Sequence, residues 1–315
     1  MKLTSIEAKK ISEDYNLGAV KSLKIIPGGC VNYNFLLKTE TGFYILRGLG
    51  RKDKKTEKRL GIEFKLINHL QKKNYPYGIP IPIKNSKGKY ISSINGERVW
   101  IYKKLPGVHS NRFTNIQLKQ VAKAVATYHR YVKDFPIKGK LMGKTYSQLK
   151  KRYSQMSKIK PKNKVDKMML EALPMFQEIL KKYYKINFSK NSLWNHRDIH
   201  RHNVLFKKGE ISGIIDFECI DYGPRINDLA HITKTSLFEN GQNLSKERFN
   251  LFLREYEKIN PLTKQERKLI LPWLIKHNCN MFEYFYTHCF DGKVPDVGCL
   301  KWTIDTTKGA LKELI

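Results

Sequence analysis

The sequence predicts an α+β, bilobal fold, in which a β-rich first lobe with one helix precedes a mostly helical second lobe. Up to about residue 105, short apolar and aromatic runs are separated by glycine and proline turns, a pattern typical of strands. Beyond that point, apolar residues recur at helical spacing over longer stretches. A chain of 315 residues is long enough to give each lobe its own core. We therefore expect lobes at 1–105 and 106–315, hinged near residues 103–107.

Three strands are expected at the start of the first lobe. "KSLKIIPGG" (21–29) ends in a glycine pair, and "NYNFLLKT" (32–39) is apolar and aromatic. "ETGFYILRG" (40–48) begins with a glycine turn and continues into a β-rich run. Together these segments predict an antiparallel meander.

One helix and one further strand complete the first lobe. The apolar residues at helical spacing in segment 56–73 are Leu60, Phe64, Ile67 and Leu70. Three prolines and a glycine between residues 75 and 82 end this helix, and "ERVWIYKKLPG" (97–107) predicts a strand. In the second lobe we predict helices at 114–133, about 145–157, about 163–184 and several after residue 228.

Charge is distributed unevenly along the chain, whose formal net charge is +32. Residues 1–198 contain 43 Lys and Arg against 13 Asp and Glu, whereas residues 199–315 contain 17 against 15. The segment 138–167 has eleven basic residues and one acidic residue. Such a segment indicates either an anionic partner, such as nucleic acid, or a solvated lysine-rich face. The preference for lysine favours the solvated face, because arginine is the stronger phosphate ligand.

The composition predicts a cytoplasmic protein with no membrane partner. No run approaches the roughly 18 apolar residues of a membrane span, and the N-terminus is polar where a signal peptide needs an apolar stretch. Five cysteines without a CxxC pair predict reduced thiols. The oligomeric state is left open by the sequence.

Residues typical of phosphoryl transfer gather in "WNHRDIHRHNVLF" (194–206), a predicted loop between two β segments. Asp198 and Asn203 are five residues apart, so both can face one side of the loop. Asp216 follows an apolar strand, where a carboxylate is costly unless it meets a cation. The three residues offer oxygen ligands that suit Mg²⁺ and a carboxylate that can accept a hydroxyl proton. This set of groups predicts phosphoryl transfer.

The same residues resemble a known family. HxDxxxxN (His196, Asp198, Asn203) followed by IDF at Asp216 resembles the Brenner-type motif of kinase-fold phosphotransferases. "GIIDFECIDYGPRINDLA" (213–230) is similar, more narrowly, to the group of aminoglycoside phosphotransferases, choline kinases and homoserine kinases. The resemblance implies a protein-kinase-like fold with ATP and Mg²⁺ as cofactors. It also implies that Asp198 is the catalytic base, that Asn203 and Asp216 hold Mg²⁺, and that His196 braces the loop.

The resemblance extends to a nucleotide site in the first lobe. "PGGCVNYNF" is similar to the nucleotide loop of the homoserine kinase-like branch, which puts Gly28, Gly29 and Asn32 nearest the phosphates. Arg47, in "YILR", stands where kinases carry the lysine of VAIK, and arginine can grip phosphate in a fork. Glu63, on the following helix, is the expected ion-pair partner of Arg47; the alternative is an exposed helix acid.

The predicted hinge supplies the remaining nucleotide contacts. The backbone of Tyr102, Lys103 and Leu105 is expected to meet adenine, because strand edges leave N–H and C=O groups unpaired. With the glycine loop and Arg47, this would place the whole nucleotide against the first lobe.

Candidate substrate contacts lie close to the two motifs. Arg201 could hold the γ-phosphate or the substrate, or it could face water. Glu218 follows the IDF motif directly, and Arg225 could pair with an acceptor carboxylate or only pin its turn. Asp228 lies where a helix starts, so an N-cap and a functional role are both open. His129 matches a position that is commonly histidine in the family, and a packed core role is favoured for it.

The favoured acceptor is homoserine or a similar amino alcohol, since the "GPR" turn and the "GGxxNxN" loop resemble homoserine kinase-like proteins. An aminoglycoside calls for an acidic cleft, which a basic helical region disfavours, and choline or ethanolamine would need an aromatic cage. The twelve-residue separation of Asp216 and Asp228 leaves no room for a protein kinase's activation segment. A last alternative is a catalytically silent kinase-fold module that binds nucleic acid through residues 138–167; retention of Asp198, Asn203 and Asp216 together argues against it.

Overall fold

The computed structural model describes residues 3–27, 32–50, 53–139, 143–290 and 297–315. The chain divides into two compact units. The first unit comprises residues 1–108 together with 205–208 and 212–218, and the second comprises 109–204, 209–211 and 219–315. The two short segments after residue 204 bring the chain around Asp216 into the first unit, which a division at residue 105 does not include.

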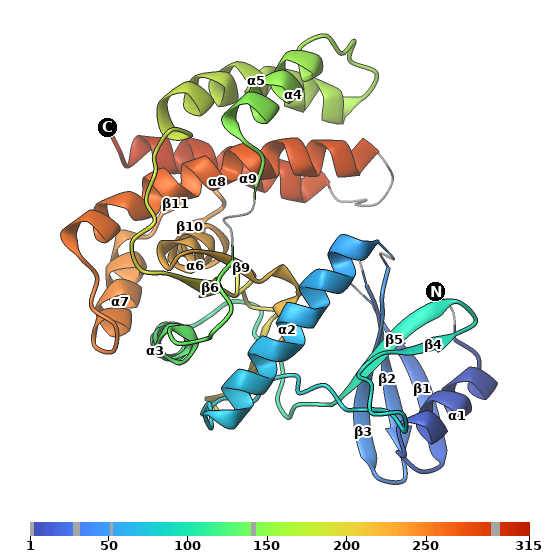
Figure 1. Ribbon diagram of the computed structural model, residues 1–315. Coiled ribbons are helices and arrows are strands. Elements are labelled where there is room, and N and C mark those ends of the chain that lie inside the picture. Colours follow the sequence, from blue (N-terminus) through green and yellow to red (C-terminus); the bar gives the residue numbers. More distant parts are fainter. Residues whose placement is uncertain (1–2, 28–31, 51–52, 140–142, 291–296) are drawn as a thin grey trace. The chain divides into compact units, whose positions relative to one another are not determined.

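The first unit is built on a five-stranded antiparallel sheet (Figure 1). Its strands, in spatial order, are β1 (Val20–Ile26), β2 (Tyr33–Thr39), β3 (Gly42–Gly48), β5 (Glu97–Lys103) and β4 (Ser92–Ile94). The register of β2 on β3 runs from Tyr33 opposite Gly48 to Thr39 opposite Gly42, so a two-residue turn joins them. The predicted meander is confirmed. The predicted glycine turn at 28–29 lies outside the described residues.

Two helices cover the two faces of this sheet, where the sequence pattern predicted one. α2 (Lys54–Lys72) packs Leu60 and Phe64 against Ile45 and Trp100 of the sheet. On the other face, α1 (Ser5–Asp14) buries Ala8 and Ile11 in a cluster with residues of β2, β3 and β5. The apolar stripe of α1 is short, which is why its periodicity was not apparent. The signal of α1 is instead a capping box, in which the Thr4 hydroxyl accepts the Glu7 N–H.

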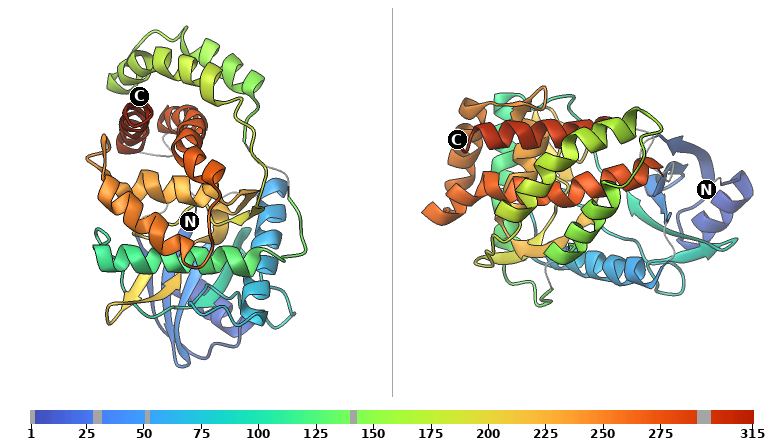
Figure 2. Two further views of the ribbon diagram at one scale, coloured as in Figure 1. Left: turned by 90° about the vertical axis from the view of Figure 1, so that its left-hand side faces the viewer. Right: turned by 90° about the horizontal axis from the view of Figure 1, so that it is seen from above.

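The second unit is mainly helical, as predicted (Figures 1 and 2). Its helices are α3 (Asn115–Val132), α4 (Tyr146–Met156), α5 (Lys164–Tyr183), α6 (Ile226–Ile232), α7 (Lys246–Glu257), α8 (Lys264–Phe290) and α9 (Val297–Lys312). α3, α4 and α5 begin one residue after Thr114, Thr145 and Asn163, whose side chains accept backbone N–H groups. The three predicted helices at 114–133, 145–157 and 163–184 are therefore confirmed.

Short strands and turns position the motif residues. They are β6 (Ser192–Asn195), β7 (Val204–Lys207), β8 (Glu210–Ile214), a 3₁₀ turn (Phe217–Cys219), β9 (Asp221–Pro224), a π-helical turn (Thr233–Leu237), β10 (Phe238–Glu239) and β11 (Asn243–Leu244). β6 pairs with β9, and β7 pairs with β8. α8 packs against α4, α5, α6 and α9, and α4 and α5 lie along one side of α8 and α9 in both figures.

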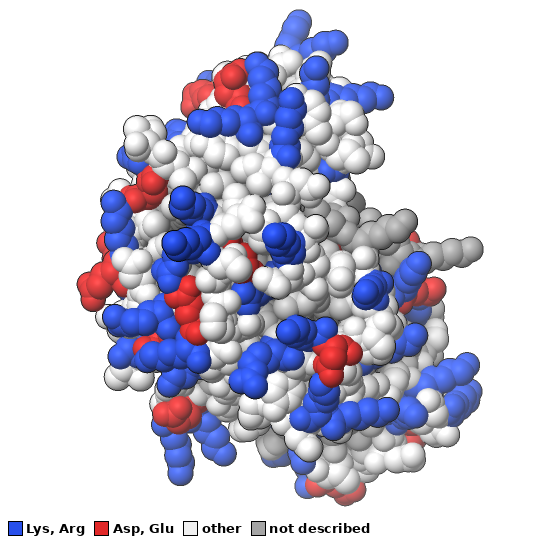
Figure 3. Space-filling view, turned by 60° about the vertical axis from the view of Figure 1, so that its left-hand side comes forward, with Lys and Arg blue, Asp and Glu red and all other residues white. Residues whose placement is uncertain are grey.

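Lysine and arginine side chains are scattered over the face shown in Figure 3 and gather at its top, where α4 and α5 lie. The exposed lysines of α4, α5 and the residues between them are Lys150, Lys151, Lys158, Lys160, Lys162, Lys164, Lys167, Lys181 and Lys182. Two other cations of the segment, Lys144 and Arg152, form ion pairs with the buried Glu283. Within the described ranges, no helix combines the length and apolarity that a membrane span requires.

Candidate active site

The loop that carries Asp198 is anchored from inside the second unit. β6 ends at Asn195, and residues 196–203 follow. The His196 side chain is fully buried, and its Nδ1 accepts a hydrogen bond of 3.3 Å from the backbone N–H of Asp198. His196 therefore braces the loop from the core, so that Asp198 has a defined position.

Asp228 holds the same loop from the opposite direction. Its carboxylate accepts the backbone N–H groups of His196 at 3.0 Å and of Arg197 at 2.7 Å. Arg197 has a left-handed backbone with φ of +69°, a conformation that costs roughly 1–3 kcal/mol in a residue other than glycine. The two hydrogen bonds to Asp228 offset that cost and keep the turn in place.

Asp228 is not an N-cap. Arg225 is the N-cap residue of α6 and makes no capping hydrogen bond through its side chain, and Asp228 is the third residue of the helix. Behind it, His129 is 1% exposed and bonds Asp228 Oδ2 through Nε2 at 2.9 Å and the Tyr256 hydroxyl through Nδ1 at 2.7 Å. The packed, hydrogen-bonded role predicted for His129 is confirmed. Burial raises the pKa of Asp228, but the bonds from His129 and from the loop outweigh it and lower that pKa below its ordinary value.

Asp198 lies in an environment that favours its ionised form. The nearest ring nitrogens are His200 Nε2, 3.4 Å from Asp198 Oδ1, and His231 Nε2, 3.6 Å from the same oxygen. His200 Nδ1 accepts the His202 N–H, which puts the proton of a neutral His200 ring on Nε2, toward Asp198. Burial raises the pKa of Asp198, but the histidines outweigh it and lower that pKa to about 2. Asp198 is therefore a carboxylate at neutral pH.

Asn203 is oriented by Asp198. Its Nδ2 donates to the backbone oxygen of Asp198 at 2.8 Å and to Asp198 Oδ2 at 2.9 Å. The side chain is buried, at 6% exposure. Because the amide nitrogen is engaged in this way, the amide oxygen Oδ1 is the atom that Asn203 has available as a cation ligand.

Asp216 is positioned within the first unit by a close approach of two glycines. Gly78 and Gly213 form a parallel bridge in which the Ile214 N–H donates to Gly78 O at 2.9 Å. A Cβ on Gly213 would lie 2.9 Å from Gly78 O, so only glycine fits without displacement. Two residues after Ile214, Asp216 has a φ of +67°, which aspartate tolerates better than most residues.

Arg47 joins β3 to the Asp216 segment. Its Nη2 donates to Asp216 Oδ1 at 2.8 Å and to Glu218 Oε2 at 2.7 Å, and the side chain is nearly buried. Two carboxylates are therefore gathered on one guanidinium, an arrangement that orders the turn after β8.

Within the described residues, Glu63 does not form the predicted ion pair with Arg47. Among the described residues, the ion pairs of Arg47 run to Asp216 and Glu218, and Glu63 Oε1 is buried without a hydrogen-bond partner. Burial raises the pKa of Glu63 to about 8, although Arg47 lowers it. Because the other two carboxylates already balance the charge of Arg47, Glu63 is stabilised in its protonated form. The alternative of an exposed helix acid is also wrong, since Glu63 is 3% exposed.

Asn32 and Glu218 lie on the same side of the first unit as Arg47. Asn32 Nδ2 donates to Glu218 Oε2, and Asn32 Oδ1 accepts the Gly50 N–H at 3.1 Å. The predicted phosphate contacts Gly28 and Gly29, which precede Asn32, lie outside the described residues.

The hinge residues fall at the end of β5. Ile45 pairs with Tyr102 and Tyr44 with Lys103, so these two of the three predicted hinge residues belong to the sheet, and Leu105 follows the end of β5. Burial raises the pKa of Tyr102 to about 12, which keeps its hydroxyl protonated. A Cβ on Gly213 would lie 3.0 Å from Leu105 Cδ1, so Leu105 packs over the strand that leads to Asp216.

Two of the candidate substrate residues have other partners. Arg201 is exposed and donates from Nε to His202 at 3.0 Å. Arg225 is 6% exposed, and it donates to both oxygens of Glu266 at 2.6 and 2.8 Å and to Pro261 O at 2.6 Å. These contacts match the second of the two alternatives for Arg225, in which its side chain only holds its own turn in place.

Four residues near Asp198 had no assigned role in the sequence: Arg197, His231, Lys234 and His277. Their mutual contacts are described below. A signal was present, because residues 228 and 231 are three positions apart and so are neighbours on α6, and Lys234 follows three positions later in the π-helical turn. That signal carries weight only once Asp228 is known to face the loop.

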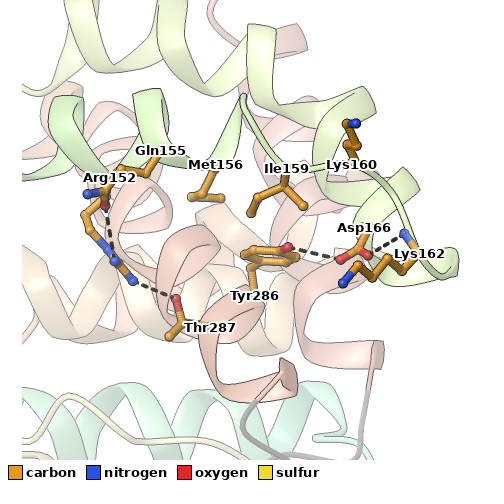
Figure 4. Close-up of a pocket in the computed structure, with 9 residues that line it drawn as sticks. All are labelled: Arg152, Gln155, Met156, Ile159, Lys160, Lys162, Asp166, Tyr286 and Thr287. Atoms are coloured by element: carbon orange, nitrogen blue, oxygen red, sulfur yellow. Dashed lines mark hydrogen bonds between the residues drawn. The ribbon is translucent and has the colours of Figure 1, made fainter.

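A cavity of about 530 Å³ lies elsewhere in the second unit, between α4, α5 and α8 (Figure 4). Its lining includes Met156 and Ile159, which lie across the cavity from Tyr286, and Tyr286 donates its hydroxyl to the buried Asp166. The predicted site residues do not line it. Among described groups of His, Cys, Asp and Glu, no cluster of three that could hold a metal ion is found.

Comparison with known proteins shows the family and the fold of the chain. The model of the family described as "Phosphotransferase enzyme family" (APH) matches residues 22–262. A homoserine kinase from Chelativorans sp. is 26% identical over 289 residues, which cover 91% of this chain and 86% of that protein. A homoserine kinase from Phenylobacterium zucineum is 25% identical over 301 residues, which cover 95% of this chain and 88% of that protein. The solved structure of an amicoumacin kinase in complex with AMP-PNP, Ca²⁺ and Ami superimposes with a TM-score of 0.71 at 17% identity and covers 99% of this chain and 94% of that one. The chain belongs to the APH phosphotransferase family, whose members are kinase-fold enzymes that act on small molecules.

Proposed function

We propose that this protein transfers the γ-phosphoryl group of ATP, with Mg²⁺, to a hydroxyl of a small metabolite, and that the acceptor is homoserine or a similar amino alcohol. The observation that carries the proposal is the environment of Asp198, an ionised carboxylate held by His200 and Asn203. A carboxylate positioned in this way can accept the hydrogen bond of an acceptor hydroxyl and take its proton as the phosphoryl group transfers. Asp198 is therefore the proposed catalytic base.

Asn203 and Asp216 are the proposed Mg²⁺ ligands. Amide and carboxylate oxygens are the donors that Mg²⁺ prefers, and the amide nitrogen of Asn203 is already bound to Asp198. Arg47 holds Asp216 by one nitrogen and so defines where its carboxylate points. When bound, Mg²⁺ would neutralise charge on the phosphates.

The first unit is the proposed nucleotide-binding lobe, and the second is the proposed acceptor lobe. Asn32, Arg47 and the backbone of residues 102–105 are proposed nucleotide contacts, together with Gly28 and Gly29. The buried guanidinium of Arg47 supports this assignment, because it places a positive charge at the turn that carries Asp216. The similar solved structure is a complex with AMP-PNP, which supports a nucleotide as the phosphoryl donor.

Homoserine is the leading acceptor because two relatives that cover most of this chain carry that name. A panel of hydroxyl acceptors with Mg·ATP, scored by ADP release, decides among homoserine, choline, ethanolamine and an aminoglycoside. We expect homoserine to give the highest kcat/KM. Higher turnover with the aminoglycoside would replace homoserine as acceptor while leaving the phosphotransferase assignment in place.

The base assignment is tested by Asp198→Asn. The variant should bind ATP with near-normal affinity and lose turnover by a factor of about 10²–10⁴, because it removes the proton acceptor while keeping the shape of the side chain. A matched control is Asp134→Asn at an exposed position, which should retain activity. Near-normal turnover of Asp198→Asn would remove Asp198 from the role of base.

A further inference from the structure

A group of basic side chains lies beside Asp198, within the second unit. His231, on α6, has its Nε2 3.6 Å from Asp198 Oδ1. The ring of His277, on α8, is 6.4 Å from the ring of His231. Arg197 Nη2 lies 3.1 Å from His277 Nδ1. A continuous run of contacts therefore leads from the proposed catalytic base through two imidazoles to a guanidinium.

Lys234 completes this group from the π-helical turn after α6. Its side chain is 5% exposed, and its Nζ donates to the Thr303 hydroxyl on α9 at 3.0 Å. The ring of Phe285 lies 5.9 Å from the same nitrogen. A hydroxyl and a ring face are weak compensation for a buried ammonium, which ordinarily requires an anion. Burial is the main cause that lowers the pKa of Lys234; Cys299 raises this pKa and the charge of Arg197 lowers it, and the net result is a pKa of about 7.

Among the described residues, two acids lie at ion-pair distance from this group, Asp221 beside Arg197 and Asp198 beside His231, and none lies at that distance from Lys234. Asp221 Oδ2 is 3.8 Å from Arg197 Nη1, too long for a hydrogen bond. Asp198 is already contacted by His200 and Asn203. Both ring nitrogens of His231 are shielded from solvent and have no hydrogen-bond partner in the part of the chain that the structure describes. Within the described residues, the group therefore holds a buried ammonium with no acid at ion-pair distance and an imidazole without a hydrogen-bond partner, and a small anion would supply both.

We propose that Arg197 and Lys234 bind a carboxylate of the acceptor whose hydroxyl is held by Asp198, with His231 and His277 lining the space between the two ends. The proposal rests on the proposed function and narrows its acceptor to a short hydroxy acid. It excludes a bare amino alcohol, choline and aminoglycosides, which bring only cations and hydroxyls to a group that is already basic. It also moves the carboxylate contact away from Arg225, whose donors are taken by Glu266 and Pro261.

The acceptor pair that tests the inference is L-homoserine and its carboxamide, which differ only in the charge of one end. We expect a kcat/KM roughly 10- to 100-fold higher for the carboxylate, since an ionic hydrogen bond is lost with the amide. Equal kcat/KM for the two compounds would overturn the inference and leave the phosphotransferase assignment intact.

Binding of the same two compounds, measured by calorimetry in the presence of Mg²⁺ and AMP-PNP, tests the carboxylate site separately from the proposed phosphotransferase function. If the protein transfers no phosphoryl group to either compound but binds the carboxylate preferentially, the proposed function fails and the carboxylate site stands. If it binds neither compound, or binds both equally, the carboxylate site fails.

Lys234→Met is the variant that assigns the site, because methionine nearly keeps the length of lysine and suits a buried position. It should raise KM for homoserine roughly 10- to 100-fold, with KM for ATP and the kcat/KM for the carboxamide unchanged. Lys268→Met, at an exposed position of α8, is the matched control and should change none of these values. An equal loss for homoserine and for the carboxamide would indicate a structural role for Lys234 and overturn its assignment.

Arg197→Lys and Arg197→Met provide an independent pair, in case Lys234→Met does not fold. The lysine variant keeps the charge and should retain part of the preference for the carboxylate, whereas the methionine variant should abolish it. A preference that survives in Arg197→Met would remove Arg197 from the site.

Discussion

At the scale of single residues, the candidate site depends on charged side chains whose charge is compensated by neighbouring groups. Asp198, Asp228 and Glu266 are carboxylates whose pKa values lie below the ordinary range because neighbouring donors outweigh burial. Lys234 is the opposite case, a cation whose burial is incompletely compensated. Satisfied charges stabilise the fold, and an unsatisfied charge indicates a ligand.

The buried pair of Arg225 and Glu266 should be a strong contributor to stability. Glu266 is fully buried and also accepts the Thr263 N–H at 2.9 Å, so Glu266→Gln would leave Arg225 uncompensated. We expect a loss of about 3–5 kcal/mol in the free energy of unfolding at pH 7, measured by urea denaturation. Glu178→Gln, in an exposed pair with Lys181, is the control and should change little.

The same variant has a predictable pH dependence. Burial raises the pKa of Glu266, but the bonds from Arg225 outweigh it and lower the pKa to about 2, below the unfolded value. A carboxylate with a depressed folded pKa stabilises fully above the unfolded pKa and loses that contribution as pH falls toward the folded pKa. The difference between wild type and Glu266→Gln should therefore narrow from pH 7 to pH 3. A difference independent of pH would show that Glu266 acts through packing rather than charge.

At the scale of elements, the site depends on where strands and helices end. Asp198 follows β6, Asp216 follows β8, and Asp228 is in the first turn of α6. Both Arg197 and Asp216 have left-handed backbones, so each motif turns sharply just where its acidic group is presented. This geometry requires that the flanking elements be held firmly.

Gly213→Ala tests this requirement at β8. The added methyl group would lie 2.9 Å from Gly78 O and 3.0 Å from Leu105 Cδ1, and so would push apart the segments that position Asp216. We expect a loss of about 1–3 kcal/mol in stability and a lower kcat/KM. Gly61→Ala is the control, because its Cβ would meet nothing within 4 Å on α2 and should stabilise the helix by about 0.5–1 kcal/mol. Wild-type values for Gly213→Ala would show that the strand can shift without consequence.

At the scale of the whole molecule, the excess of positive charge is mostly solvated. The lysines of α4, α5 and their connection are exposed, whereas the cations of the proposed acceptor site lie on other elements, with Lys234 buried and Arg197 half-buried. The net charge of +32 should nonetheless attract polyanions at low ionic strength.

Nucleic-acid binding by the segment 138–167 can be measured by filter binding with a salt titration. If this is a solvated face, binding should be weak, without sequence preference, and lost by about 0.2 M salt, where screening is strong. Replacing Lys150, Lys151 and Lys158 by Gln should then leave kinase activity unchanged. Tight binding that persists at 0.2 M salt and is lost in this variant would establish a specific partner.

The sequence by itself determined the family resemblance, the meander, the order of the long helices and the two acidic motifs. Each of these depends on local spacing along the chain, such as the five-residue separation of Asp198 and Asn203, which limits a loop to few arrangements. α1 escaped prediction because only two of its apolar residues, Ala8 and Ile11, enter the core.

Only the tertiary structure decided which charges meet. In the structure, Arg47 forms ion pairs with Asp216 and Glu218 in place of the expected pair with Glu63. Arg225 forms an ion pair with Glu266. The tertiary structure also brought four basic side chains together from separate elements. They are Arg197 in the loop after β6, His231 on α6, Lys234 in the π-helical turn and His277 on α8. The physical reason is that the strength of an ion pair depends on the distance between its charges and on their burial. For residues that are 80 or 169 positions apart, the sequence shows neither the distance nor the burial.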